Sequence, residues 1–540
     1  MKNVKGNNMK KEIKLTVAAA LALVAFAAAA ERIGIVSDTH VGWKNTAERL
    51  EQCYRLFKAQ KVDRIINLGD ICEYHNPDWY RQYVAIREKV YPEGAPAEVY
   101  VFATHDRMKV KIPKGDRENA LAFEKMKPVL KVANDRYDRF ESEGFTFLVY
   151  PQAKDYGRME REIAEECAAH PGRPLFVLDH VPPSNTVDGS ANGGDHRTRA
   201  IFDKHPEVIA LSGHVHGSQM HEGKIWQGSF TAVGSGTIKS QACPGGGGRF
   251  HVTVLDLSKE RAVFHRYDIA SGEELRPERP WTLTFPFDPK TAPYAPETRR
   301  AGAPTPTFAP GAALKAKLVG TPLREIEITY PAAVTPDVSH YEILLEAKSG
   351  DGWKVRSRAK EVSDYVVPEA RRKKAFVRHF PSGFFEDDET VRFAVVPVDF
   401  YGKRGEPLRL EQKIGKTEEW RTLYDGVPEP AKPGAFASFR GDSWFTVPPA
   451  ALDVPDGTPC RIILDAALDL DEDTVASFNL RTDKTCTYAF GYIYAPLGKS
   501  ELRYVREFVR PKERSENFNL YLQRAAKGKV RFDRLRIECK

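Results

Sequence analysis

The sequence lacks the features that mark several common functional classes. Its seven cysteines are scattered, and none forms the C-x-x-C pair typical of thiolate zinc sites. It has no G-x-S-x-G turn to carry a serine nucleophile and no G-x-x-x-x-G-K-[ST] loop to bind a nucleoside triphosphate. The net charge of +7 is small for 540 residues, and no stripe of basic residues alternates with aromatic ones. A nucleic-acid partner is therefore not expected.

Long apolar runs are also scarce, and the only candidate lies at the N-terminus. Three lysines precede an apolar run over residues 15–30 that ends in Ala28-Ala29-Ala30, the layout of a secretory signal peptide. The run is shorter than the roughly 20 apolar residues of a membrane-spanning helix. We therefore predict a signal peptide over residues 1–30 and a periplasmic, cell-surface or secreted protein with no transmembrane segment. Because export permits disulfides, Cys460 and Cys486 are a candidate pair, although the sequence sets no connectivity.

The length predicts two to four domains, and the patterns of apolar residues place them. Strand-like runs alternate with helix-like stretches at 46–58 and 157–169, which favours an α/β domain. Proline-rich connectors follow at 277–310 and 427–434, and the remaining sequence alternates as half-buried strands. The strand-like runs of the first domain are residues 33–36, 64–68, 99–103, 145–149, 175–178 and 208–211. The expected boundaries are 31–275 for the first domain, 276–300 for a linker, and 301–416 and 417–540 for two all-β sandwiches.

Short segments rich in histidine, aspartate and small residues follow the strand-like runs of the first domain. Because side chains at the carboxyl ends of strands meet in one crevice, we expect these segments to face a common site. Carboxylate oxygen and imidazole nitrogen are the donors that hard and borderline divalent metals select. The segments are residues 37–40, 68–70, 103–106, 179–183 and 212–216. Each motif alone occurs by chance in unrelated loops, but their order and context together predict a metal centre.

The spacing within these segments suggests how the ligands divide. Asp38 and His40 stand two residues apart and can both turn toward one ion, and His214 and His216 stand in the same relation. Asp70 follows a glycine that lets the backbone approach closely, so its carboxylate could bridge two ions.

The series D-x-H, G-D, a histidine in the G-N-H-D/E position, H-x-P and G-H-x-H resembles the signature of calcineurin-like phosphoesterases. The resemblance covers residues 33–269. It implies two divalent ions (Mn, Zn, Fe or Mg) in a four-layer α/β (α+β) sandwich of two mixed β-sheets flanked by helices. It implies that one ion binds Asp38, His40, Asp70 and His216, and the other Asp70, Thr104, His180 and His214.

One position departs from the family pattern. The family usually has Gly-Asn-His-Asp/Glu where this chain has Ala103-Thr104-His105-Asp106. In the family the asparagine amide binds the second ion and helps to hold phosphate, whereas Thr104 offers a shorter and weaker hydroxyl ligand. The second ion is therefore expected to bind less tightly than the first. Glu73 stands where purple acid phosphatases have a tyrosine, so no iron–tyrosinate chromophore is expected.

The resemblance implies hydrolysis of phosphate mono- or diesters by hydroxide that the two ions activate. In this reading Asp70 bridges the ions, His105 protonates the leaving alcohol, and Thr104, His105 and His180 hold the substrate. The alternative is a non-catalytic surface or glycan-binding protein with a degenerate phosphoesterase domain, which Thr104 supports. The otherwise complete ligand set favours the enzyme.

The two C-terminal segments carry weaker resemblances. Residues 301–416 resemble a fibronectin type III-like sandwich, chiefly through 340–346 and 391–402. Residues 417–540 resemble the closing strands of a jelly-roll module of carbohydrate-binding type, so a glycan is the partner considered for this segment.

Overall fold

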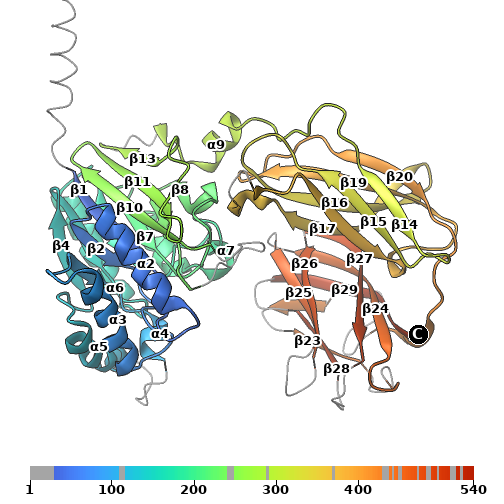
Figure 1. Cartoon of the computed structure of the whole chain (residues 1–540), viewed down its shortest axis with the longest axis horizontal. Helices are drawn as coiled ribbons and strands as arrows, with labels where there is room; N and C mark the ends of the chain where they lie inside the picture. Colours follow the sequence, from blue (N-terminus) through green and yellow to red (C-terminus); the bar gives the residue numbers. More distant parts are fainter. Residues whose placement is uncertain are drawn as a thin grey trace, which may run out of the picture. The chain divides into compact units, whose positions relative to one another are not determined.

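The structure is a computed structural model in which the chain divides into two compact units, Met1–Ala301 and Gly302–Lys540 (Figure 1). It describes residues 30–108, 116–239, 249–286, 291–367, 371–427, 437–440, 443–447, 453–470, 474–481, 488–495, 498–510, 518–522 and 527–540. The predicted signal peptide, except for Ala30, lies outside the described residues, and so does Cys486. No helix within the described residues is both long and apolar enough to cross a membrane.

The first sheet of unit 1 has the strand order β12-β11-β10-β1-β2-β3, and β13 pairs with β11. Strands β1, β2 and β3 are parallel, and β10 runs antiparallel to β1, so the sheet is mixed. Its strands are β1 (Glu31–Val36), β2 (Arg64–Asn67), β3 (Ala97–Tyr100), β10 (His251–Ser258), β11 (Arg261–Asp268), β12 (Glu274–Leu275) and β13 (Trp281–Thr284).

The second sheet of unit 1 has the order β4-β5-β6-β7-β9-β8. Strands β5, β6, β7 and β9 are parallel, and the two edge strands are antiparallel to their neighbours. Its strands are β4 (Asp138–Ser142), β5 (Phe145–Val149), β6 (Leu175–Leu178), β7 (Val208–Ser212), β8 (Ile225–Gln227) and β9 (Thr231–Gly234).

Helices cover the outer faces of both sheets. One buried cluster joins residues of both sheets, among them Ile35, Leu68, Phe147 and Leu211, and this is the core between the sheets. A second cluster packs helices α2, α3 and α5 on the first sheet, and a third packs α6 and α8 on the second. The helices are α2 (Thr46–Ala59), α3 (Pro77–Val90), α5 (Asp116–Leu130), α6 (Tyr156–Ala169) and α8 (His196–Phe202). The predicted four-layer fold is confirmed.

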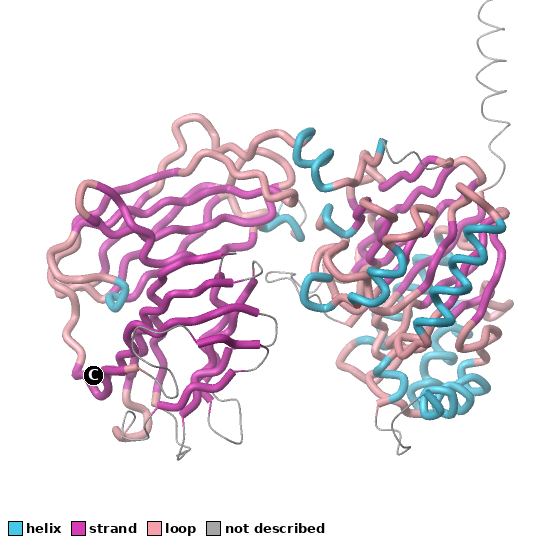
Figure 2. The backbone as a smooth tube through the Cα atoms, turned by 180° about the vertical axis from the view of Figure 1, so that it is seen from behind, coloured by secondary structure: helices cyan, strands magenta, loops and turns pink. Residues whose placement is uncertain are grey.

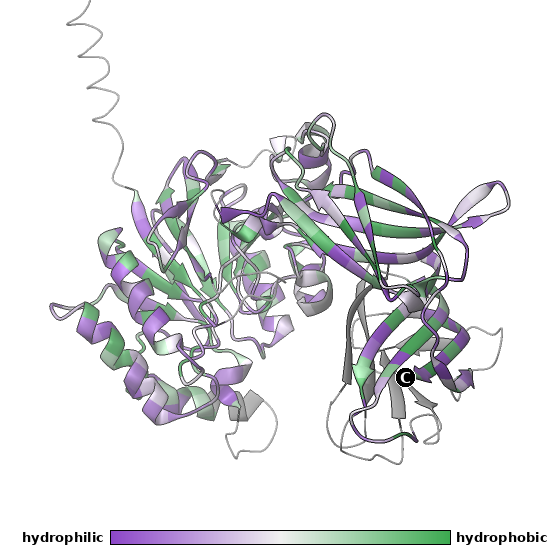
Figure 3. Ribbon diagram, turned by 45° about the vertical axis from the view of Figure 1, so that its right-hand side comes forward, coloured by the Kyte–Doolittle hydropathy of each residue, from purple (hydrophilic) through white to green (hydrophobic). Residues whose placement is uncertain are grey.

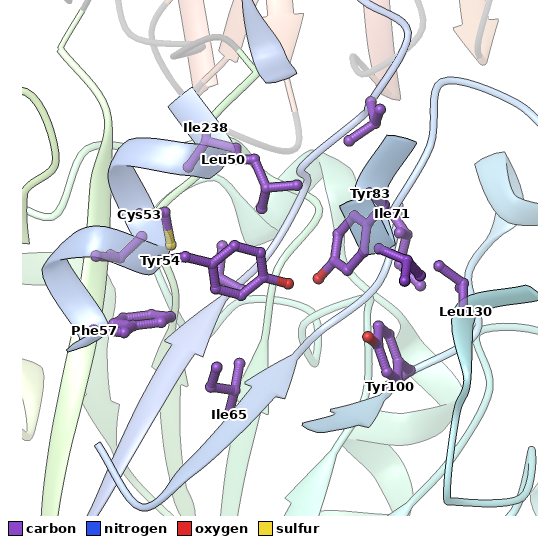
Figure 4. Packing of buried hydrophobic residues seen from close by; sticks show 14 of the residues in the cluster. Leu50, Cys53, Tyr54, Phe57, Ile65, Ile71, Tyr83, Tyr100, Leu130 and Ile238 are labelled. Carbon is purple, nitrogen blue, oxygen red and sulfur yellow. The ribbon is translucent and has the colours of Figure 1, made fainter. Parts of the chain in front are cut away.

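Helix α2 shows how the sequence produces this layering. Its buried residues Leu50, Cys53, Tyr54 and Phe57 recur three or four apart, so they form one apolar stripe that faces the sheet (Figure 4). Where polar groups enter this core, they are paired. Buried Glu98 accepts hydrogen bonds from the hydroxyls of Tyr54 (3.0 Å), Tyr83 (2.6 Å) and Tyr100 (2.7 Å), and from Arg87 (2.9 Å).

The expected linker at 276–300 contains regular structure. Strand β13 pairs with β11 over four residues, and the short helix α9 (Pro296–Gly302) follows. Trp281 at the start of β13 is fully buried in the core between the sheets. Unit 1 therefore continues beyond residue 275, because this buried side chain makes the proline-rich segment part of the sheet.

Unit 2 consists mainly of strands (Figure 2). A three-stranded sheet, β14-β15-β18, and a four-stranded sheet, β17-β16-β19-β20, share one buried cluster. Burial alternates along β15, as the half-buried strand pattern predicts, and hydrophobic and hydrophilic residues alternate along these strands (Figure 3). Their bounds are β14 (Lys315–Val319), β15 (Glu325–Pro331), β16 (Val338–Ser349), β17 (Gly352–Val362), β18 (Ala375–Pro381), β19 (Thr390–Asp399) and β20 (Leu408–Lys413).

Two further sheets complete unit 2, with orders β21-β29-β24-β27, to which β22 is added, and β23-β28-β25-β26. Cys460 on β24 lies opposite Cys539 on β29. The bounds are β21 (Arg421–Gly426), β22 (Ala437–Arg440), β23 (Ser443–Val447), β24 (Pro459–Leu470), β25 (Thr474–Arg481), β26 (Tyr488–Ala495), β27 (Gly498–Val509), β28 (Phe518–Leu522) and β29 (Lys527–Cys539). The fibronectin type III-like and jelly-roll assignments stay predictions.

Candidate metal centre

The carboxyl ends of parallel strands from both sheets of unit 1 carry the predicted ligands. Asp38 and His180 lie two residues beyond the ends of β1 and β6, His214 two beyond β7, and Asp70 three beyond β2. His105 follows β3 on the short helix α4 (Thr104–Arg107). The donor atoms lie within 4.8 Å of one another in three overlapping groups: Asp38, His40 and His216; His40, Asp70 and His105; and Asp70, His180 and His214.

The first group gathers around the carboxylate of Asp38, which is buried. His216 Nε2 lies 2.9 Å from Asp38 Oδ1, and His40 Nε2 lies 3.9 Å from the same oxygen. The other oxygen, Oδ2, accepts hydrogen bonds from the Ser37 hydroxyl (2.6 Å) and from the backbone N–H of His214 (3.0 Å). These bonds fix the carboxylate so that Oδ1 faces the histidines.

Asp70 lies between the two predicted ligand sets. Its Oδ2 is 3.6 Å from His40 Nε2 and 3.1 Å from His180 Nε2, while Oδ1 accepts the backbone N–H of His105 (3.0 Å). One carboxylate thus faces a histidine from each set, as the predicted bridging role requires.

The Nδ1 atoms of three histidines have partners that set the ring orientation: a hydrogen bond in His180 and His105, and an ion-pair contact in His40. The Nδ1 atom of His180 lies 2.8 Å from the carbonyl oxygen of Leu68. The Nδ1 atom of His40 lies 2.9 Å from Glu73 Oε2, and that of His105 lies 2.6 Å from the Glu73 carbonyl oxygen. The Nε2 atoms of His40 and His180 are buried and make no hydrogen bond to described residues. Imidazoles held through Nδ1 present Nε2 to the site, which is how metal-binding histidines are oriented.

The backbone at the site is held in an unusual conformation. Five of the predicted ligands have positive φ angles, which non-glycine residues seldom adopt: Asp38 (52°), His40 (41°), Asp70 (51°), His214 (67°) and His216 (45°). Such strain persists where the surrounding structure enforces it, and it clusters at functional sites.

Two glycines let these loops come together. Gly69 has a φ of 101°, and a Cβ there would lie 2.8 Å from Ala103 Cβ and 2.9 Å from the carbonyl oxygen of Val101. A Cβ on Gly213 would lie 1.8 Å from the Ser37 hydroxyl oxygen. The glycines of the G-D and G-H-x-H motifs are therefore required by the close approach of neighbouring loops.

Burial and close charges shift the pKa values of the predicted ligands in both directions. Burial alone would raise the pKa of Asp70, but the charge of His180, whose Nε2 lies 3.1 Å from the carboxylate, outweighs it and lowers that pKa to about 2. Conversely, burial would lower the pKa of His180, but Asp70 raises it to about 10. Burial and the neighbouring charge of His180 lower the pKa of His214 to about 4. The carboxylate of Asp70 thus favours the charged form of His180, whereas burial favours the neutral form of His214.

Thr104 lies at the start of α4, beside the predicted second ligand set. Its backbone N–H donates to the side-chain oxygen of Gln152 (2.7 Å), and the next N–H, of His105, donates to Asp70. Gln152, which no motif marked, thus places an amide side chain next to the position where the family has asparagine.

Two acidic residues with no assigned role in the motifs shape the site. Glu73 orients His40 with its carboxylate and His105 with its carbonyl, and its carboxylate also pairs with Lys239 (2.7 Å). Asp106 accepts the backbone N–H groups of Ile71 (2.9 Å) and Ala103 (3.1 Å), and so joins the two loops. The acidic last position of the family's Gly-Asn-His-Asp/Glu motif could have marked Asp106 from the sequence. No sequence signal distinguishes the role of Glu73.

Comparisons with known proteins found similarity to one family model and to several solved structures. Residues 31–218 match the family model for calcineurin-like phosphoesterase. Similar solved structures include a dimetal phosphatase from Danio rerio (10% identity, TM-score 0.34, covering 47% of this chain and 99% of that chain). They also include GAP50, the anchor in the inner membrane complex of Plasmodium (13% identity, TM-score 0.33, covering 48% of this chain and 91% of that chain). No curated protein matches the chain. Residues 31–218, with their motifs, are therefore similar to calcineurin-like phosphoesterases.

Proposed function

We propose that the chain is an exported, binuclear metal-dependent phosphoesterase that hydrolyses phosphate mono- or diesters. The observation that carries the proposal is the convergence of two buried carboxylates with four histidines, of which His40 and His180 have buried Nε2 atoms without a hydrogen-bond partner among described residues. A buried polar atom without a partner is costly unless a ligand satisfies it.

The residues present fit two divalent ions. The donors are carboxylate and imidazole, which manganese, zinc, iron and magnesium accept to differing degrees. Asp38, His40, Asp70 and His216 would hold the first ion, and Asp70, His180, His214 and the residue at position 104 the second. Bound there, the ions would supply hydroxide near neutral pH and neutralise charge on the phosphoryl oxygens.

His105 is suited to the proton transfer. With Nδ1 donating to the Glu73 carbonyl oxygen at 2.6 Å, a protonated ring keeps Nε2–H available for the leaving oxygen. Its backbone N–H is bonded to the bridging Asp70, so the proton donor is tied to the same carboxylate as the ions. The ring lies 4.5 Å, between centroids, from that of His40, which places it at the edge of the ligand set.

The test is metal analysis of the purified full chain, followed by activity on a panel of phosphate monoesters and diesters with manganese or zinc. We expect at least two ions per chain and hydrolysis that a chelator abolishes. The Asp70→Asn variant, nearly identical in shape, is the matched control and should lose both. A chain that binds two ions but hydrolyses none of the esters would support the alternative of a binding protein with a degenerate domain, which the threonine at position 104 favours.

Export is part of the proposal and depends on the lysines and apolar run that precede Glu31. N-terminal sequencing of material from the native host should find a mature chain that begins near Glu31. An intact N-terminus retained in the membrane would contradict export without affecting the catalytic proposal.

A further inference from the structure

A second group of metal-binding side chains lies at the opposite end of β7 from the candidate metal centre. Cys167 is in the last turn of α6, and His205 and Glu207 lie between α8 and β7. One donor atom from each lies within 4.8 Å of the other two. Glu207 precedes the first residue of β7 and His214 follows the last by two. At about 3.3 Å per strand residue, the two groups are therefore separated by more than about 13 Å.

The backbone around this group is fixed, while its side chains have few other partners. The N–H of His205 donates to the carbonyl oxygen of Phe202 (2.9 Å), and the carbonyl oxygen of Glu207 accepts the N–H of Leu175 (2.9 Å). Among described residues, the side chains of Cys167 and His205 make no hydrogen bond or ion pair. Among described residues, the Glu207 carboxylate accepts only one long hydrogen bond, from the backbone N–H of Gly172 (3.4 Å).

We propose that Cys167, His205 and Glu207 form a third divalent-metal site, of zinc type, that joins the last turn of α6 to the segment before β7. Sulfur, nitrogen and oxygen are the three donor types that zinc combines in proteins. With zinc–donor distances of about 2.0–2.3 Å, donors of a tetrahedral ion lie about 3.3–3.6 Å apart, so each pair of these three needs to approach by at most about 1.5 Å. Water would complete the fourth position.

The surroundings suit entry of a cation. All three side chains are half-exposed, so an ion can enter from solvent. Burial, together with the charges of Glu207 and Glu166, raises the pKa of the Cys167 thiol to about 12. Coordination forms a sulfur–metal bond and releases the thiol proton to water. The neutral thiol is a poor nucleophile, which argues against reading the same three residues as a cysteine–histidine–acid catalytic triad.

The site would be made by the fold and not by a sequence motif. Cys167 is 38 residues from His205, with no C-x-x-C or H-x-x-x-H spacing to signal it. The site is independent of the proposed phosphoesterase activity, because none of its residues belongs to the candidate metal centre.

Cobalt substitution tests the site directly, because the donors of the candidate metal centre are only nitrogen and oxygen. The metal-free full chain is titrated with Co²⁺, and thiolate-to-cobalt charge-transfer absorption in the near ultraviolet is measured. We expect the band to saturate at the intensity of one thiolate-bound ion per chain, after no more than about three equivalents of Co²⁺, since the candidate metal centre also takes up the ion. We expect it to disappear on addition of zinc and to be lost in Cys167→Ser. His205→Gln and Glu207→Gln keep the thiol and should weaken binding at least tenfold, since losing even an outer partner of a metal ligand costs roughly 10–100-fold.

Two controls separate this site from its surroundings and from the catalytic proposal. His170→Gln changes a half-exposed histidine at the C-cap of the same helix and should leave the band unchanged. Asp70→Asn should abolish ester hydrolysis and leave the band unchanged. Absence of the band in the unsubstituted chain overturns the proposal. A band that persists in Cys167→Ser also overturns it, and so does unchanged affinity for Co²⁺ in both His205→Gln and Glu207→Gln. Circular dichroism would confirm that these variants are folded.

Discussion

Glu73 serves two histidines through different atoms, and this allows its roles to be separated by mutation. Its carboxylate lies 2.9 Å from Nδ1 of His40, while its carbonyl oxygen lies 2.6 Å from Nδ1 of His105. Glu73→Ala removes the first contact and keeps the second, because the backbone carbonyl remains. We therefore expect metal affinity to fall while proton transfer by His105 is preserved.

The expected magnitude follows from the position of Glu73 as an outer partner of a metal ligand. Loss of such a partner costs roughly 10–100-fold in metal affinity, equivalent to about 1.4–2.7 kcal/mol. The carboxylate is largely buried, with 18% of the side chain exposed, so water replaces it incompletely. Glu73→Gln keeps a hydrogen-bond acceptor but loses the charge, and its loss should be smaller than that of Glu73→Ala.

The assay is ester hydrolysis against added manganese after chelation. We expect the half-saturating metal concentration to rise 10–100-fold in Glu73→Ala, with little change of kcat at saturating metal. Lys239→Met is the matched control: it removes the cation 2.7 Å from the same carboxylate and leaves the Glu73–His40 contact in place. Unchanged metal dependence in Glu73→Ala would refute the orienting role of the carboxylate. A kcat at saturating metal as low as that of His105→Ala would refute the separation of the two roles.

Four further changes test the rest of the site and its support. Asp70→Asn should cost more metal affinity than any other single ligand change, because its carboxylate faces a histidine from each set; a variant that keeps two ions and full activity would contradict the bridging role. His105→Ala should slow turnover roughly 10²–10⁴-fold with little loss of metal, and less for nitrophenyl than for alkyl esters; equal losses on both would remove it as the acid. Thr104→Asn should raise affinity for the second ion and activity at limiting metal, and superimposable metal curves would mean that another group already fills that position. Lys154→Met breaks a buried ion pair and should lower unfolding free energy by about 3–5 kcal/mol in urea denaturation, while the exposed Lys204→Met should be nearly neutral; equal effects would contradict this.

Gln152 offers a specific explanation if Thr104→Asn has no effect. Its side-chain oxygen accepts the Thr104 N–H at 2.7 Å, so an amide already stands beside the position where the family has asparagine. Combining Gln152→Ala with Thr104→Asn would then reveal a benefit of the asparagine that the single variant hides.

Short buried strands were predicted best, because continuous apolar runs in parallel sheets have clear ends. Residues 145–149 and 175–178 match β5 and β6. The run at 99–103 extends beyond β3, whose pairing stops at Tyr100, because its partner β2 ends at Asn67 and turns into the loop that carries Asp70. The strand β13 was missed, because proline content indicates an extended chain but not whether that chain joins a sheet.

The motifs were enough to predict that these carboxylates and histidines lie together, because strand, tight glycine loop and ligand are adjacent in the chain. Each motif therefore carries its own local geometry to the carboxyl end of its strand. Tertiary packing set what surrounds that centre and what forms elsewhere. It turned the carboxylate of Glu73 toward one histidine and its carbonyl toward another, and it brought Cys167 to His205 and Glu207. Such contacts depend on helix packing and side-chain direction between distant segments, for which local spacing contains no signal.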